Sequence, residues 1–431
     1  MVIETQSQAR IDELDARFRE RRAQVPVLAQ RAGDEGITAI RTYEDMVPLL
    51  FPHTTYKSYP ETLVSKGMWA QLNKWLDSLS VHRVDVDVTG VDDVDGWVER
   101  LEGAGHLVTG SSGTSGKASF LNKSPADRDA SLEDFIRCLA DLGLPPQQVW
   151  HVIPTGPETG VRSHLVMRDL LVRNYGRPDA IAIPPAKVSS GHYRYMARLA
   201  AMRRAMADGT ARPDDLAAFE AESVQRQQQN EERLRYLAGQ VLAHREDPML
   251  FSAMFANLYR LVEILRELGA SPGDATAQNA LTTGGGLKGM TLPPDYREQC
   301  FAMLHIAPER FLHYYSMQEL NVRMPKCPEA GRYHVPAALH LFVLDKAGEA
   351  LVPQSDGQAE GRAAFFDFTV DGRWGGTISG DKIMAEFRRC RCGRPGPTIV
   401  DEISRYADLP DGDKITCAGT MDAYVRGFIE D

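Results

Sequence analysis

A run of small and hydroxyl-bearing residues followed by a lysine is the first feature of this chain that could do chemistry. The stretch 106–123 reads HLVTGSSGTSGKASFLNK, and its centre is Ser111, Ser112, Gly113, Thr114, Ser115, Gly116 and Lys117. Small residues let a backbone bend tightly and turn its N–H groups toward a phosphate, while hydroxyls and a lysine add donors and positive charge. The run predicts a phosphate-binding loop, and a flexible Ser/Gly linker is the alternative interpretation.

The order of residues in the loop excludes a Walker A motif, G-x-x-x-x-G-K-[ST]. Counting back from Gly116 and Lys117, the first glycine falls on Ser111, and the residue after the lysine is Ala118. The loop instead resembles the phosphate loop of adenylate-forming enzymes, which convert a carboxylate and ATP to an acyl-adenylate and pyrophosphate.

Two later segments resemble further signatures of that family, in the family's order. LTTGGGLKG at 281–289 resembles the glycine loop beside the adenine and the carboxylate substrate, with Thr283, Gly284, Gly285 and Gly286. YYSMQEL at 314–320 resembles the aromatic and acidic motif. The resemblance implies that Tyr315 stacks on the adenine, Gln318 contacts phosphate and Glu319 holds Mg²⁺. The family usually has Thr at the position of Gln318, and a tight turn and an ordinary surface loop are the alternatives for the two segments.

Two more segments follow in the same order. TISGDKI at 377–383 comes after a hairpin pattern, and the resemblance implies that Asp381 binds the two ribose hydroxyls. A Ser-Gly-Asp turn without function is the alternative. CGRPGPTIVDEISRYAD at 392–408 resembles the stretch that runs into the family's hinge, with Arg405 and Asp408 at the hinge-like positions. The resemblance covers about residues 100–419 and is nearest to the phenylacetate–CoA ligase branch and the acyl-protein synthetases of bacterial bioluminescence.

Most members of this family continue past the hinge into a small lid domain that carries a catalytic lysine. This sequence continues only to Asp431, so we expect no lid, and Lys288, Lys117 and Lys414 are the candidates for the missing cation. In the bioluminescence synthetase the acyl group moves to a cysteine near the C-terminus, and Cys417 has the comparable place here. A thiolate is a good acceptor for a mixed anhydride. The alternative is an incidental cysteine.

Four residues in two pairs predict a metal site. Cys327 and His334 form a C-x₆-H pair, and Cys390 and Cys392 form a C-x-C pair. Three thiolates and one imidazole make a complete tetrahedral set for structural Zn²⁺. Unliganded cysteines are the alternative. The remaining pair, Cys138 and Cys300, lies in apolar helical patterns and is expected in the core.

The composition limits the class of protein. The formal net charge is −10, and lysines and arginines form only short clusters, so nucleic acid is not expected as a partner. No apolar run reaches the length of a membrane helix, and the charged start does not read as a secretory signal. Six cysteines in 431 residues fit a reducing cytoplasm rather than a disulfide scaffold.

Periodicity predicts an α/β fold, and the resemblance implies the layered large domain of an adenylate-forming enzyme. We expect an N-terminal mixed segment over 1–100, a core over 101–403 with a β-rich part near 327–392, and a hinge-like tail over 404–431. The expected helices are 9–31, 43–50, 61–79, 124–142, 164–174, 212–246 and 251–268, and the expected strands are 84–88, 106–109, 149–154 and several after 334.

These features lead to one hypothesis and two rivals. The first is ATP- and Mg²⁺-dependent activation of a fatty or aryl carboxylic acid, followed by transfer to a thiol that could be Cys417. The second is a stand-alone ligase that delivers the acyl group to CoA or a carrier protein. The third is a degenerate nucleotide-binding subunit of a reductase complex.

Overall fold

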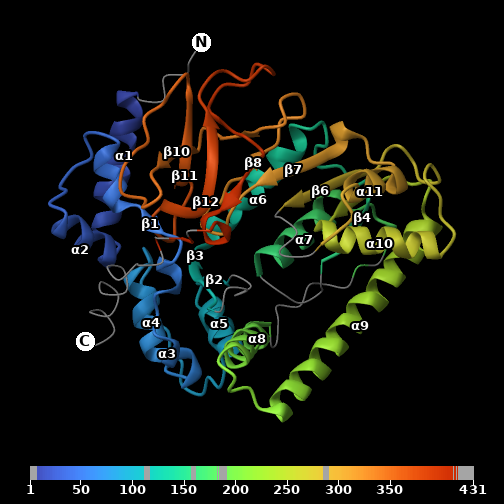
Figure 1. Ribbon diagram of the computed structural model, residues 1–431, viewed down its shortest axis with the longest axis horizontal. Helices are drawn as coiled ribbons and strands as arrows, with labels where there is room; N and C mark the ends of the chain where they lie inside the picture. The colour runs from blue at the N-terminus through green and yellow to red at the C-terminus, as the bar shows by residue number, and fades with distance from the viewer. Residues whose placement is uncertain are drawn as a thin grey trace. The chain divides into compact units, whose positions relative to one another are not determined.

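The chain folds as a mixed α/β protein with separate sheets (Figure 1). The computed structural model describes residues 7–110, 117–156, 162–181, 183, 192–284, 291–410, 412–413 and 415. The chain divides into two compact units. Unit 1 comprises Met1–Gly113, Lys117–Asp134 and Met317–Asp431, and unit 2 comprises Thr114–Gly116 and Phe135–Ser316.

An antiparallel sheet forms the centre of unit 1, with strands in the order β10-β11-β12-β13-β9 (Figure 1). Aromatic and aliphatic residues dominate LHLFVL and the second half of β11, and both segments are largely buried, as strands that pack on two faces must be. β1 pairs in parallel with the first part of β12, and β14 pairs with the middle of β12. The strands are β1 Phe51–Pro52, β9 Tyr333–His334, β10 Leu339–Leu344, β11 Gln358–Asp367, β12 Gly376–Glu386, β13 Thr398–Ile399 and β14 Ser404–Arg405.

Short helices and one hairpin complete unit 1. The α-helices are α1 Gln8–Arg22, α2 Pro26–Asp34, α3 Glu61–Ser65, α4 Trp69–Ser78 and α5 Val94–Gly103, with 3₁₀ turns η1 Glu44–Leu49, η2 Thr55–Lys57 and η4 Tyr406–Asp408 and the short strand β8 Met324–Pro325. The hairpin consists of β2 Leu107–Gly110 and β3 Phe120–Lys123. The ring of Trp97 meets that of Phe120 edge-on at 5.2 Å, so α5 and the hairpin share a core.

Three sequence predictions in this region were wrong. The helix expected over 9–31 is two helices, because Pro26 cannot donate within a helix and starts a new one. The helix expected over 61–79 breaks at Gly67, which has φ +64°. The strand expected over 84–88 is unpaired extended chain, since the Asn73 amide donates to Val86 O and Asp77 accepts from the Val84 N–H.

The Ser/Gly loop joins two antiparallel strands. Gly110 and Phe120 pair at its two ends, so the loop closes the β2–β3 hairpin. The sequence predicted a strand, the loop and then a helix, and it missed β3 because FLNK is too short to show periodicity. The expected helix follows β3 as α6 Pro125–Ala140.

A parallel sheet organises unit 2. Its strands β4 His151–Pro154, β5 Met249–Ser252, β6 Ala280–Gly284 and β7 Phe311–Tyr315 pair as parallel neighbours in that order. The helices are α7 Arg162–Tyr175, α8 His192–Ala207, α9 Pro213–Ala243, α10 Phe255–Glu267 and α11 Tyr296–Leu304, with the 3₁₀ turn η3 Pro308–Arg310. The helix predicted over 251–268 starts too early, because its first residues belong to the strand β5, which the sequence analysis did not predict.

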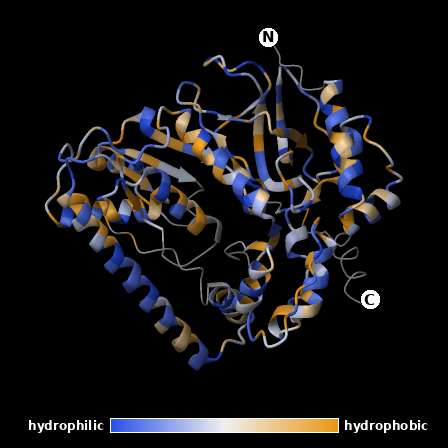
Figure 2. Ribbon diagram, turned by 180° about the vertical axis from the view of Figure 1, so that it is seen from behind, coloured by the Kyte–Doolittle hydropathy of each residue, from blue (hydrophilic) through white to orange (hydrophobic). Residues whose placement is uncertain are grey.

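The core of unit 2 lies between the sheet and α9, α10 and α11. Leu258, Leu261 and Leu281 are fully buried in it. The C-terminal part of α9 adds Leu234, Leu237, Ala238 and Val241, whereas none of its described residues before Leu234 is buried, and this part is mostly hydrophilic in Figure 2. The strongly charged part of α9 is therefore a solvated face.

Among the described residues, no helix combines the length and the apolar character that crossing a bilayer demands.

Replacement of Leu261 by alanine tests the core of unit 2. This side chain is fully buried, and its loss should lower the free energy of unfolding by about 2–5 kcal/mol. Leu268, at the end of the same helix, is 50% exposed, so Leu268→Ala should change it by no more than about 0.5 kcal/mol. Urea unfolding followed by circular dichroism measures both, and equal effects would contradict the packing described here.

Candidate functional site

The first half of the predicted metal site is a tight turn after β8. The Cys327 N–H donates to Arg332 O at 2.7 Å, and the Gly331 N–H donates to Cys327 O at 2.8 Å. The Ala330 N–H donates to Cys327 Sγ at 3.4 Å. Gly331 has φ +66°, which suits glycine, so the turn holds the sulfur in one direction.

The second half is a turn after β12. The Gly393 N–H donates to Cys390 O at 2.9 Å, and Gly393 has φ +83°. β13 then joins the two halves, because Thr398 pairs with His334 and Ile399 pairs with Ala385. Residues about sixty positions apart in the sequence therefore meet at one edge of the sheet of unit 1.

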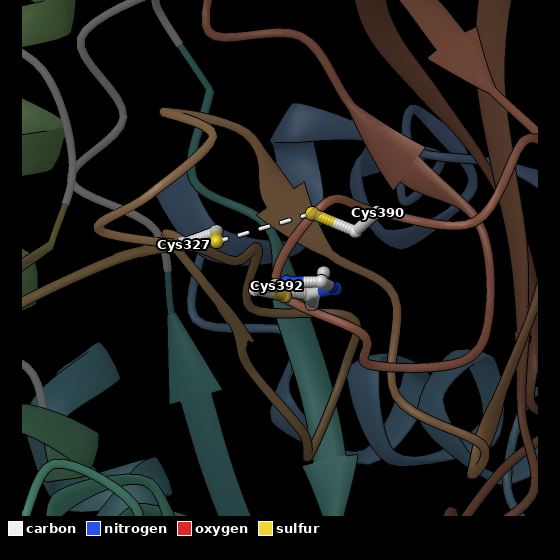
Figure 3. A group of neighbouring side chains, drawn as sticks. Cys327, Cys390 and Cys392 are labelled. Atoms are coloured by element: carbon white, nitrogen blue, oxygen red, sulfur yellow. Dashed lines mark hydrogen bonds between the residues drawn. The ribbon is translucent and has the colours of Figure 1, made fainter.

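The four side chains converge on one point. Their ligand atoms all lie within 4.8 Å of one another. Cys390 Sγ is 3.9 Å from Cys327 Sγ (Figure 3). Cys392 Sγ is 3.3 Å from His334 Nε2. A tetrahedral zinc ion at its usual bond lengths separates two sulfurs by about 3.8 Å and a sulfur from a nitrogen by about 3.6 Å. The cluster thus has the dimensions of a metal site.

The surroundings favour a bound metal over four idle side chains. Cys327, Cys390 and His334 are buried and Cys392 is half-buried, and all three cysteines are free thiols. Burial, with the charge of Arg394, lowers the pKa of His334, which keeps the imidazole in the neutral form that binds metals. Four protein ligands leave no open position for a substrate, so the arrangement fits a structural ion.

The other two described cysteines lie in the core, as the sequence predicted. Cys138 is 1% exposed on α6, and Cys300 is fully buried on α11. Burial raises the pKa of the Cys300 thiol to about 12, so it is inert at neutral pH.

Asp381 and Arg405, predicted from two separate motifs, are directly opposite each other in the sheet. They are a register pair of β12 and β14, and Arg405 Nε lies 3.8 Å from Asp381 Oδ1. The Asp381 side chain is 17% exposed, and Arg405 is mostly in solvent. A half-buried carboxylate at this position remains reachable by a polar ligand.

The charges of Asp381 and Glu319 both act on His53, a residue that the sequence analysis did not single out. The His53 N–H donates to Ile378 O at 2.8 Å, which extends the β1–β12 pairing and sets the imidazole against Gly380. Burial lowers the pKa of His53, and the carboxylates of Glu319, Asp413 and Asp381 act against that shift. The negative charges of these three carboxylates therefore all act on one imidazole.

Two further residues border this group. Lys57, on η2, has a pKa lowered by burial, while Glu319 raises it and Arg405 lowers it. Asp413 is fixed by a buried ion pair, since Arg362 Nη2 lies 2.7 Å from Asp413 Oδ1. No spacing rule links residues 53 and 57 to the later motifs. The only sequence signal that could have indicated them is the presence of two basic side chains in a short loop.

The entrance to the Ser/Gly loop is tied to the acidic motif. Gln318 Nε2 donates to Gly110 O at 3.0 Å, so the amide of Gln318 holds the last described residue before the loop. At the other end, Lys117 Nζ donates to Tyr59 O and lies 4.3 Å from the centre of the Tyr59 ring. Both ends of the predicted phosphate loop are thus anchored within unit 1.

The residues predicted to face the adenine belong to unit 2. Thr283 and Gly284 end β6, and Tyr315 ends β7, so they lie at the carboxyl edge where parallel sheets bind ligands. A Cβ on Gly284 would come within 2.5 Å of the Tyr314 ring, which explains the glycine. Tyr314 packs against this glycine, and its neighbour Tyr315 is half-buried.

Several predicted site residues lie outside the described part of the chain. They are Ser111, Ser112, Gly113, Thr114, Ser115, Gly116, Gly285, Gly286, Lys288, Lys414 and Cys417.

A second group of possible metal ligands, His151, His244 and Asp247, lies in unit 2. The Ile181 N–H donates to His151 Nδ1 at 3.2 Å, so the proton of the neutral ring is on Nε2, which faces Asp247 at 3.4 Å. A histidine with a proton on the nitrogen that faces the cluster cannot ligate a metal there. The group also lies at the amino edge of the parallel sheet, away from the carboxyl edge. We therefore assign it a structural role.

The comparisons with known proteins add no assignment, because the chain matches no family model and no curated protein.

Removal of one thiol should empty the metal site. Purified protein is expected to carry one metal ion per chain, and Cys390→Ser or Cys327→Ser should lower this by about tenfold or more, because a structural site needs all its ligands. Cys138→Ser, which changes a core thiol, should retain the metal. Inductively coupled plasma mass spectrometry measures the content. Full metal content in Cys390→Ser would contradict the assignment.

Proposed function

We propose that this chain activates a carboxylic acid with ATP and Mg²⁺ and passes the acyl group to a thiol. In the first step a carboxylate oxygen attacks the α-phosphorus of ATP, and the bond to pyrophosphate breaks. In the second step a thiolate attacks the acyl carbon, and AMP leaves. The observation that carries the proposal is the 3.0 Å hydrogen bond from Gln318 Nε2 to Gly110 O, which ties the acidic motif to the start of the Ser/Gly loop.

The geometry of unit 1 suits a nucleotide. Asp381 is a half-buried carboxylate that can accept hydrogen bonds from two ribose hydroxyls. Glu319 supplies an oxygen ligand of the kind that Mg²⁺ prefers. Gln318, which directly precedes Glu319, is hydrogen-bonded to the residue at the start of the Ser/Gly loop. This link supports a phosphate position close to the metal. The departure from the family's Thr at this position thus has a structural use.

Catalysis in this proposal depends on position and charge. The Ser/Gly loop and Lys117 hold the β- and γ-phosphates, and cations such as Lys57 and Arg405 offset the negative charge that develops on the phosphates. Lys57 adds a candidate to the lysines considered from sequence for the role of the missing lid cation, and its electrostatic coupling to Glu319 and Arg405 supports that choice.

Zn²⁺ is our proposal for the ion in the Cys₃His cluster. Three thiolates and one imidazole are a soft, tetrahedral donor set, which zinc occupies in closed structural sites. The ion would join the turn after β8 to the turn after β12, and β12 carries Asp381.

The acyl acceptor in this proposal is Cys417 of the same chain. The residues just before it are attached to unit 1, since the Ile415 N–H donates to Asp413 Oδ1 at 3.0 Å and Asp413 pairs with Arg362. Asp413 also acts on His53, so the chain that leads to Cys417 starts beside the proposed nucleotide site. CoA or a carrier protein as acceptor, with a reductase as a possible partner, is the rival.

Carboxylate-dependent exchange between ATP and pyrophosphate tests the first step. With a panel of fatty and aryl acids, at least one acid should support exchange, and Asp381→Ala or Glu319→Ala should lower the rate by at least about 100-fold. Glu133→Ala removes an exposed carboxylate on α6 and should leave the rate unchanged. ATP binding without exchange for any acid would instead favour a degenerate nucleotide-binding subunit.

Intact-mass spectrometry tests the acceptor. After incubation with ATP, Mg²⁺ and the active acid, the chain should gain the mass of one acyl group, and Cys417→Ser should abolish this gain while pyrophosphate exchange continues. Cys138→Ser serves as the thiol control. Acyl transfer to an external thiol at the normal rate by Cys417→Ser would exclude self-acylation as the route.

A further inference from the structure

One buried carboxylate in unit 1, that of Asp127, collects hydrogen bonds from three separate parts of the chain. Asp127 is fully buried near the start of α6. Its Oδ2 accepts from the Ser124 N–H at 2.9 Å, and the Asp127 N–H donates back to Ser124 Oγ at 3.1 Å. This is a reciprocal cap at the start of the helix.

The other donors come from far away in the sequence. Asn321 Nδ2 donates to Asp127 Oδ1 at 2.7 Å. The Asp371 N–H donates to Oδ1 and the Gly372 N–H donates to Oδ2, each at 2.9 Å. Arg373 Nη1 lies 3.6 Å from Oδ2. The carboxylate therefore joins residues 124–127, 321 and 371–373.

Each of these three segments borders a part of the proposed nucleotide site. Ser124 follows the β2–β3 hairpin that holds the Ser/Gly loop, and Asn321 follows Glu319 by two positions. Residues 371–373 lead into β12, which carries Asp381. One side chain thus connects the phosphate loop, the metal-binding acid and the ribose-binding acid through short stretches of chain.

The chain next to Glu319 is also held by buried charges. Arg373 Nη2 donates to Glu319 O at 2.7 Å, and Lys123 Nζ lies 3.4 Å from Leu320 O. The Asn321 N–H donates to Asp367 Oδ2 at 2.7 Å, and the Arg323 N–H donates to Asp134 Oδ2 at 2.9 Å. The main chain from 319 to 323 is thereby fixed.

The carboxylate of Asp127 is closely packed. A Cβ on Gly372 would lie 2.8 Å from Asp127 Oδ2 and 2.9 Å from Ser124 N, so this position needs glycine. Burial alone would raise the pKa of Asp127, but Arg373, Asn321 and Lys123 lower it to about 2. The group is therefore ionised at neutral pH, and its charge is balanced by its neighbours.

We infer that Asp127 is a positioning residue that holds Glu319 and Asp381 at the spacing the nucleotide site needs, although it touches no substrate itself. The inference rests on the proposed function for its catalytic consequence. It rests on the hydrogen bonds above for its structural part, which can be tested separately.

Asp127→Asn is the first variant. It keeps the shape of the side chain but replaces one acceptor oxygen by an N–H₂ group. Either the contacts of Asn321 and Asp371 or those of Ser124, Gly372 and Arg373 are therefore lost. Amide hydrogen exchange should be about tenfold faster or more in 319–323 and 371–373. The kcat/KM for MgATP in pyrophosphate exchange should fall by about 100-fold, since small displacements of catalytic groups are costly.

Asp129→Asn is the matched control, because Asp129 is an exposed carboxylate two positions along the same helix. It should leave hydrogen exchange and kcat/KM unchanged. Thermal unfolding checks that Asp127→Asn is folded. If it is not, Asn321→Ala is assessed by the same two readouts; it removes one donor to Asp127, together with the contacts of Asn321 to Thr369 O and Lys123 Nζ.

The outcomes separate the inference from the proposed function. Unchanged hydrogen exchange at 319–323 and 371–373 in a folded variant would overturn the inference. Faster exchange there with an unchanged kcat/KM would also overturn it, because the spacing would then not matter for activity. Absence of pyrophosphate exchange in the wild-type protein would overturn the proposed function, and hydrogen exchange would still decide whether Asp127 holds the segments together.

Discussion

Burial of an ionised carboxylate is the constraint on which the arrangement of unit 1 depends. A charge removed from water is strongly unfavourable unless donors surround it. Asp127 is fully buried, and four N–H groups and a guanidinium converge on it. Because those donors come from three distant segments, the segments cannot separate without leaving the charge unpaired. The same requirement makes the local structure specific, since only one arrangement of the three satisfies it.

The ion proposed for the Cys₃His cluster would impose a second constraint, at an edge of the sheet of unit 1. It works by a different interaction, because metal–ligand bonds need four donor atoms at fixed distances, whereas the carboxylate needs N–H groups. Both act on β12: the cluster joins the turn that follows it, and Asp127 holds the residues that lead into it. Asp381 lies between these two points. With that ion bound, the strand that bears the proposed ribose ligand would be restrained at both ends.

The candidate nucleotide site follows from this framework. Glu319 and Asp381 belong to different motifs, and the charges of both carboxylates act on the imidazole of His53. The link from Gln318 to Gly110 brings the start of the Ser/Gly loop to the same part of unit 1. A site assembled in this way can position a nucleotide by several short segments, each too short to fold alone. The proposed acyl activation depends mainly on the positions of the reacting groups.

Several features could be determined from the sequence by itself, because they depend on local chemistry. Hydrophobic periodicity identified α6, α9 and the strands β10 and β11. The spacing of one Cys/His pair and one Cys/Cys pair was enough to propose the cluster that the structure assembles. Helix ends at Pro26 and Gly67 were also encoded locally, although the periodic pattern concealed them. Only the tertiary structure decided that FLNK forms a strand, that His53 and Lys57 border the acidic residues, and that Asp127 joins three segments. Asp127 pairs locally with Ser124, but its remaining partners lie about 190 to 250 positions away. Long-range contacts of this kind depend on how the whole chain packs, and no spacing in the sequence reports them.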